Sequence, residues 1–178
     1  MGGEQELQAA VYDGKNRIHS LGYQGVSGLD GVIWDLYGPE CGRRHDLVLL
    51  RKSNFNERLR DVQLDEIDQY VAYADKAYND HSHLIGAYHG HNVADWKLHD
   101  NNVMKSIRIG IEWAFGKVTS LNRYIDYYKG MAIGMIPVGR MYRVSVLLAN
   151  AHSCFYGNQS SLYFNIEPPS IEEYFRIN

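Results

Sequence analysis

The segment 101–117, which reads NNVMKSIRIGIEWAFGK, places the strongest constraint on how this chain can fold. From Ile107 to Val118 apolar residues fall on nearly every side of a helix, and such a helix is expected in a core. Glu112 interrupts this run, with Arg108 one helical turn earlier on the same face. A buried carboxylate is costly unless it is paired or bound to a cation. Glu112 is therefore either a structural partner of Arg108 or a functional acid.

The composition is that of one ordinary globular domain. The chain has 178 residues, of which 45% are hydrophobic and 22% charged, and this length allows a sizeable core. We predict a single domain over 1–178, with a loose N-terminus at about 1–10. A C-terminal tail with one short helix is expected at about 157–178. The net charge of −3 means that nucleic acid would need a local basic face.

Several absences suggest an intracellular protein, nuclear or cytoplasmic. The sequence has no apolar run long enough to span a membrane, and its first residues are too polar for a signal peptide. Cys41 and Cys154 lie far apart without CxxC spacing, so both are expected to be reduced, partly buried thiols.

Three strands are expected in the first half of the chain. Residues 17–26 and 32–37 suit a β-hairpin around a short loop that contains glycine and aspartate. The second of these runs is almost continuously apolar, which predicts an interior strand that Gly38-Pro39 ends. A third strand is predicted at 70–74. We expect 76–100 to be mostly irregular, with one short strand at most.

Capping signals and apolar periodicity predict the helices. Asp46 is suited to N-cap a short helix that begins at 47–50, and Asn54 with Glu57 resembles a capping box for a helix to residue 60. Longer helices are predicted at 102–118, with an extension toward Tyr124 left open, and at 139–156, and Ser170 with Glu173 predicts a short one at 171–175. The helix at 139–156 repeats apolar residues at helical spacing, namely Met141, Val144, Leu148, Ala151 and Phe155. This order predicts a mixed α/β fold in which helices pack on a central sheet.

Three acids stand where a metal site could form. Asp75 follows a predicted strand, Asp46 begins a helix after a GRRHD turn, and Glu112 lies within the long helix. Metal-dependent phosphoryl transfer uses carboxylates from different elements, because hard divalent cations prefer oxygen ligands. Two ions roughly 4 Å apart can hold the attacking and the leaving oxygen of a displacement. Taken singly, Asp46 could be only a helix cap and Asp75 only a turn former.

The order and spacing of several segments resemble the nuclease domain of PIF/Harbinger-type transposases, the DDE superfamily endonucleases. These segments read VYDGKNRIHSLGYQGV, DGVIWDLYGPECGRRHDLVLL, YADKAY and NNVMKSIRIGIEWAFGK, and the resemblance continues through 141–175. The resemblance implies an RNase H-like mixed sheet with flanking helices, a divalent cation (Mg²⁺ or Mn²⁺), and cutting and joining of DNA strands.

The same resemblance assigns roles to individual residues. Asp75 matches the family's second acid and Glu112 its third, so both are expected to be catalytic metal ligands. Asp46 matches a family-typical aspartate that is a further candidate ligand. Arg108 would orient Glu112 by a contact outside the metal's own ligands. An additional protein partner could supply DNA recognition, and the oligomeric state stays open.

The chain also departs from the family pattern. The family's first acid lies in an Asp-Gly-Thr strand upstream of the YDGK-like segment, whereas this chain reads MGGEQELQAAV there. We therefore predict that the first strand is missing through N-terminal truncation or a misplaced start. Asp13, Asp30 or Asp35 could replace the lost acid only by coincidence. In the turn after Asp75 the family's proline is replaced by Asn79, and Lys76 adds a positive charge beside the expected ligand.

Two weaker patterns remain open. Five histidines crowd one loop and could bind zinc, although a solvated loop explains them as well: His81, His83, His89, His91 and His99. Basic residues that could hold DNA phosphates include Arg43, Arg44 and Lys105, beside Lys15, Arg17, Arg51 and Lys52. An ordinary solvated face explains these residues equally well.

Two functional hypotheses follow, with a metal-binding histidine loop as a weaker third. The first is a transposase-derived nuclease domain that retains Asp75 and Glu112 but lacks full competence because the first acid is absent. The alternative is a non-catalytic remnant or domesticated domain that binds DNA or a protein partner.

Overall fold

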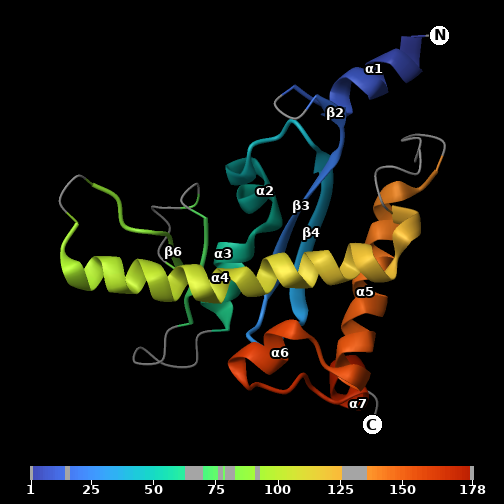
Figure 1. Ribbon diagram of the computed structural model, residues 1–178. Coiled ribbons are helices and arrows are strands. Elements are labelled where there is room, and N and C mark those ends of the chain that lie inside the picture. Colours follow the sequence, from blue (N-terminus) through green and yellow to red (C-terminus); the bar gives the residue numbers. More distant parts are fainter. Residues whose placement is uncertain are drawn as a thin grey trace. The chain divides into compact units, whose positions relative to one another are not determined.

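The structure is a computed structural model, which describes residues 2–14, 17–62, 70–75, 78, 83–90, 93–125 and 136–176 (Figure 1). The chain forms two compact units. Unit 1 contains residues 1–44 and 110–178, and unit 2 contains residues 45–109. The described elements are helices and small two-stranded sheets, so the predicted mixed α/β class is confirmed.

The centre of unit 1 is an antiparallel hairpin of β3 (Leu21–Ser27) and β4 (Ile33–Cys41). This confirms the predicted hairpin. The prediction that Gly38-Pro39 ends the second strand is wrong, because β4 continues through this cis peptide to Cys41. Among the described strands β4 pairs only with β3, so its apolar side chains are covered by helices instead of by strands on both sides.

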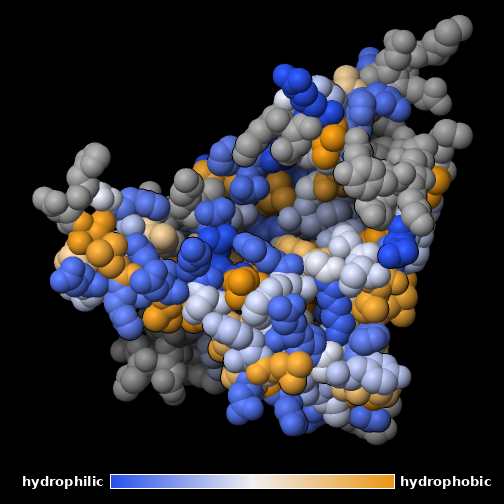
Figure 2. All heavy atoms as spheres, viewed as in Figure 1, coloured by the Kyte–Doolittle hydropathy of each residue, from blue (hydrophilic) through white to orange (hydrophobic). Residues whose placement is uncertain are grey.

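Helix α5 (Val138–Tyr156) packs on β4 and confirms the predicted helix at 139–156. The face that packs is not the predicted one, since Val144, Leu148 and Phe155 are exposed. The buried residues of α5 are instead mostly small: Ser145, Val146, Ala149, Asn150 and Ser153. The hydroxyls of Ser145 and Ser153 donate hydrogen bonds to carbonyls one turn earlier, which makes their burial inexpensive. Figure 2 shows hydrophobic atoms at the surface over α5 and α6.

The core of unit 1 joins the hairpin to the second part of helix α4 and to α5. Its buried members are Ile33, Ala114, Val118, Ile125, Val146 and Ala149. Phe115 packs so closely on β3 that a Cβ at Gly25 would lie 2.5 Å from its ring. Gly25 is therefore a point of close approach between the strand and the helix.

Helix α4 (Asp95–Leu121) begins earlier than predicted, within the loop expected at 76–100, and its end at Leu121 lies within the predicted extension toward Tyr124. The expectation of a helix buried on all sides, with Glu112 among apolar neighbours, is wrong. Lys105, Glu112 and Gly116 are exposed, while Met104, Ala114 and Val118 are buried. The helix thus has one core-facing side and one open side, and Glu112 needs no buried partner.

Unit 2 contains the first part of α4 with α2 (Asp46–Ser53), α3 (Phe55–Asp61), β5 (Ala72–Tyr73) and β6 (Leu84–Ile85). Strands β5 and β6 are parallel and confirm, in shorter form, the predicted strand at 70–74 and the short strand in the loop. Both capping predictions here are wrong. His45 is the N-cap of α2, and Asn54 adopts a left-handed conformation (φ 50°) without a side-chain cap hydrogen bond to α3.

The two ends of the chain hold helices that were not expected. Residues Gly2–Val11, predicted to be loose, form α1, which leads into a small pair of strands, β1 (Tyr12–Asp13) and β2 (Ile18–His19). Near the C-terminus, α6 (Gln159–Phe164) begins at a capping box made by Asn158 and Ser161. The predicted final helix is confirmed as α7 (Ile171–Phe175), with the Ser170–Glu173 capping box.

Candidate functional site

Asp75 lies two residues beyond the end of β5. The backbone N–H of Ala72 donates to the carbonyl of His83, and that of Ala74 donates to the carbonyl of Ile85. The pairing with β6 therefore fixes the backbone as far as Ala74, the residue before Asp75. The carbonyl of Asp75 then accepts a hydrogen bond of 2.8 Å from the N–H of Tyr78. The side chain of Asp75 is 52% exposed, so its carboxylate is accessible to a solvated ion.

Arg108 on α4 pairs with Asp75. The guanidinium Nη2 lies 3.9 Å from Oδ2 of Asp75, and both residues belong to unit 2. A half-exposed pair of this length contributes little to stability, about 0–1 kcal/mol. The pair instead orients the Asp75 carboxylate, because the positive charge of Arg108 faces it from a rigid helix. We expected Arg108 to contact Glu112, one helical turn further along α4. The ion pair that the structure describes is with Asp75 instead.

Tyr78 brings Asp46 and Asp75 into one electrostatic environment. Burial and, to a smaller extent, the negative charges of Asp46 and Asp75 raise the pKa of the Tyr78 hydroxyl to about 12. The phenol therefore stays protonated at neutral pH. Asp46 is the first residue of α2 and is exposed, so both carboxylates whose charge acts on Tyr78 are accessible to solvent.

Asn101 fixes the first part of α4 to the segment after β6. Its Oδ1 accepts from the N–H of Tyr88 at 2.8 Å, and its Nδ2 donates to the carbonyl of Tyr88 at 3.0 Å. One amide side chain thus satisfies both backbone groups of a residue outside regular structure. This explains why an asparagine stands seven residues before Arg108.

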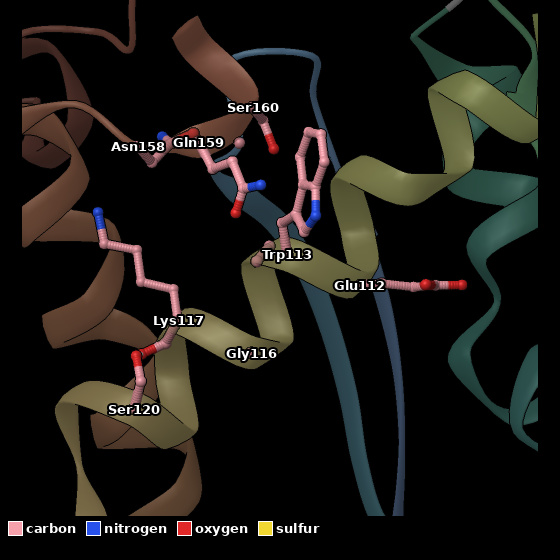
Figure 3. Close-up of a pocket in the computed structure, with 10 residues that line it drawn as sticks. Glu112, Trp113, Gly116, Lys117, Ser120, Asn158, Gln159 and Ser160 are labelled. Atoms are coloured by element: carbon pink, nitrogen blue, oxygen red, sulfur yellow. The ribbon is translucent and has the colours of Figure 1, made fainter. Parts of the chain in front are cut away.

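Glu112 is held by the packing of its neighbours on α4 in unit 1. Ile111 and Phe115 pack against the core, and Ala114 belongs to it. The carboxylate itself is exposed and points away from the residues that gather on the other side of the helix (Figure 3). Glu112 therefore stands on a well-anchored helix with its acid in solvent.

Unit 1 also contains a cavity of about 390 Å³ that the sequence did not indicate, and Glu112 is one of the residues that line it. Trp113 and Lys117 of α4 line it opposite Asn158, Gln159 and Ser160 (Figure 3). Burial lowers the pKa of Lys117, whose Nζ donates to Ser153 Oγ at 2.9 Å and to the carbonyl of Gly157 at 2.8 Å. The only sequence signal was the i,i+4 spacing of Trp113 and Lys117.

Asp30, one candidate replacement for the missing acid, has a structural role. Its Oδ1 accepts from the N–H of Val32 at 3.0 Å, and its Oδ2 accepts from Trp34 Nε1 at 3.2 Å. Burial raises the pKa of this carboxyl group. Both oxygens thus serve the turn of the hairpin.

The other predicted binding residues are placed but not joined into a site. Arg43, Arg44 and Lys105 are exposed and suited to contact with phosphates. Lys15, Lys76, Asn79, His81 and His91 lie outside the described residues. Within the described ranges, no group of three or more metal-ligating side chains converges, so the histidine-loop site has no support there. Cys41 and Cys154 are free, half-buried thiols, as expected.

The acids of unit 2 fit a divalent cation in chemistry. Mg²⁺ and Mn²⁺ take carboxylate oxygens and keep several waters, and exposed acids such as Asp75 and Asp46 allow this. Asp75 and Asp46 could therefore supply two of the oxygen ligands of such a cation, and other groups would supply the rest.

Comparison with known proteins identifies the family that this geometry belongs to. The family model described as DDE superfamily endonuclease matches residues 3–150, which is most of the chain. No curated protein and no solved structure matches the chain. Among the described residues, no helix is both long and apolar enough to cross a membrane.

Proposed function

Because this chain belongs to the DDE superfamily endonucleases, we propose that it is the nuclease domain of a PIF/Harbinger-type transposase, acting on DNA phosphodiesters. This subtype rests on the segments quoted above, from VYDGK to the helix of Glu112. Under this proposal the chain works as a single domain over 1–178 with the RNase H-like arrangement of its family. Within residues 1–178 no Asp-Gly-Thr strand supplies the family's first acid, so we expect this chain by itself to have low catalytic competence.

One observation carries the proposal. In unit 2 the accessible carboxylate of Asp75 follows a strand end, faces Arg108, and shares the environment of Tyr78 with Asp46. An acid that served only to form a turn would need no cation presented from a helix. The arrangement is suited to holding a carboxylate ready for a divalent ion.

Asp75 and Glu112 are the proposed metal ligands, with Asp46 as a third. A bound Mg²⁺ or Mn²⁺ would activate water or a DNA 3′-hydroxyl and stabilise charge on the phosphate. Asp75 and Glu112 would hold the ion through carboxylate oxygens. Arg108 would position these acids.

Arg43, Arg44 and Lys105 are the proposed phosphate contacts. All three are exposed, and such contacts fix DNA in position without reading its sequence. Sequence recognition would then come from a protein partner.

The test is manganese-dependent nicking of supercoiled plasmid. Wild type is expected to nick weakly, and Asp75→Asn and Glu112→Gln should each lower the rate by 100-fold or more, because a ligand is lost. Glu57→Gln, which changes an exposed acid on α3, is the matched control and should leave the rate unchanged. Nicking that survives Glu112→Gln would contradict the assignment.

A second candidate is a non-catalytic domain that binds DNA or a protein. It is favoured by the lack of three converging ligands in the part of the chain that the structure describes. Calorimetry separates the two: DNA binding without manganese binding would support the second candidate.

A further inference from the structure

The cavity beside Trp113 contains hydrogen-bonding groups that the described residues leave unused. Neither Trp113 Nε1 nor the amide of Gln159 has a hydrogen-bond partner among the described residues, although both side chains line the cavity. Figure 3 shows the Gln159 amide and the indole facing the same space. The amide of Asn158, in contrast, is already hydrogen-bonded. Its Nδ2 donates to the carbonyl of Asp30, and its Oδ1 accepts from the N–H of Ser161.

Lys117 adds a positive charge to the same cavity. An ammonium group has three N–H donors, and Lys117 uses two of them on Ser153 and Gly157. These bonds fix the Nζ, so one donor and the charge remain for an anion. The ligand should therefore combine a flat polar ring with a negative group.

We propose that this cavity binds one unpaired nucleotide, with its base against Trp113 and Gln159 and its phosphate at Lys117. Bases stack on aromatic side chains and use amide groups for their polar edges. A volume of about 390 Å³ lies at the lower end of small-ligand sites, which suits one nucleotide. The inference rests on the proposed function, since a DNA-processing domain meets unpaired nucleotides at a cut end.

Glu112 is among the residues that line the cavity, but its side chain does not point toward the groups proposed to bind the nucleotide. The Glu112 carboxylate points away from Trp113, Lys117 and Gln159 (Figure 3). Binding there should therefore need no metal. This separates the present inference from the nuclease assignment, which depends on metal ligands.

The experiment measures binding of a fluorescein-labelled oligonucleotide of eight thymidines in EDTA, by anisotropy. Trp113→Ala is expected to weaken binding roughly tenfold through lost stacking, and Trp113→Phe should restore most of it. Gln159→Ala changes an exposed residue, should fold normally, and should weaken binding about threefold to tenfold. Trp96→Phe, on the same helix but outside the cavity, should bind as wild type.

Further arms identify the source of the nucleotide and separate the two proposals. Thymidine 5′-monophosphate tests a free nucleotide, and a duplex of equal length should bind less tightly than the single strand. Asp75→Asn, which changes a proposed metal ligand outside the cavity, should retain oligonucleotide binding even if no nicking occurs. The proposal is overturned if Gln159→Ala and Trp113→Ala, folded by circular dichroism, bind as wild type, or if Trp96→Phe weakens binding equally.

Discussion

Asn150 shows how much one buried side chain can organise. Its Oδ1 accepts from the N–H of Ile33 at 3.0 Å, and its Nδ2 donates to the carbonyl of Ile33 at 2.8 Å and to the Tyr174 hydroxyl at 2.9 Å. The residue thus connects α5 to the start of β4 and to α7. Without it, both backbone groups of a buried residue would lose their partner.

Asn150→Leu is therefore expected to destabilise the protein strongly. Leaving the Ile33 N–H and carbonyl unsatisfied costs about 1–3 kcal/mol for each group, so the free energy of unfolding should fall by roughly 2–6 kcal/mol in urea titrations. Asn102→Leu, an exposed asparagine of α4, is the matched control and should change it by less than about 0.5 kcal/mol. Equal effects of the two variants would contradict this role.

Among whole elements, the N-termini of α3 and α7 behave differently although both carry a capping-box pattern. Ser170 Oγ accepts from the N–H of Glu173 at 3.2 Å, whereas the Asn54 side chain makes no cap hydrogen bond to α3 and the residue adopts φ 50°. Ser170→Ala should thus lower the unfolding free energy by about 1 kcal/mol. Asn54→Gly should lower the unfolding free energy much less, because glycine readily adopts this left-handed conformation. Chemical denaturation of the two variants measures this difference.

The α7 cap should also depend on pH. The carboxylate of Glu173 accepts from the N–H of Ser170 at 2.8 Å, and this hydrogen bond lowers the Glu173 pKa. Because the folded-state pKa is the lower one, the stabilisation is complete above the ordinary pKa of glutamate and is lost as the pH falls through the folded value. The stability difference between wild type and Glu173→Gln should shrink on acidification, and a constant difference would contradict the assignment.

Elements with local signals were predictable from the sequence, and those that depend on long-range contacts were not. The hairpin, α5 and α7 followed from turn residues, periodicity and a cap. The buried side of α5 did not, because Asn150 is buried through a hydrogen bond to Ile33, 117 residues away. The family resemblance named Asp75 and Glu112, but the partner of Arg108 and the cavity at Trp113 depend on contacts that no spacing encodes.

At the scale of the whole molecule, the proposed ligands are divided between the two units. Asp75 and Asp46 belong to unit 2, Glu112 belongs to unit 1, and α4 runs through the boundary between Ile109 and Gly110. A cation shared by Asp75 and Glu112 would couple the stability of both units. A cation held by Asp46 and Asp75 alone would stabilise unit 2 only.

Hydrogen exchange measured by mass spectrometry separates these cases. Ligand binding stabilises the folded state by about 2.7 kcal/mol at 100 times the Kd, which is large enough to slow exchange clearly. Under the proposed function, Mn²⁺ should slow exchange in β5 and β6 of unit 2 and also in α5 and β4 of unit 1. Glu112→Gln should confine the effect to unit 2, and Asp75→Asn should abolish it in both. Protection confined to unit 2 in the wild type, and insensitive to Glu112→Gln, would show that the acid on α4 does not hold the ion, leaving Asp46 and Asp75 as the metal-binding pair.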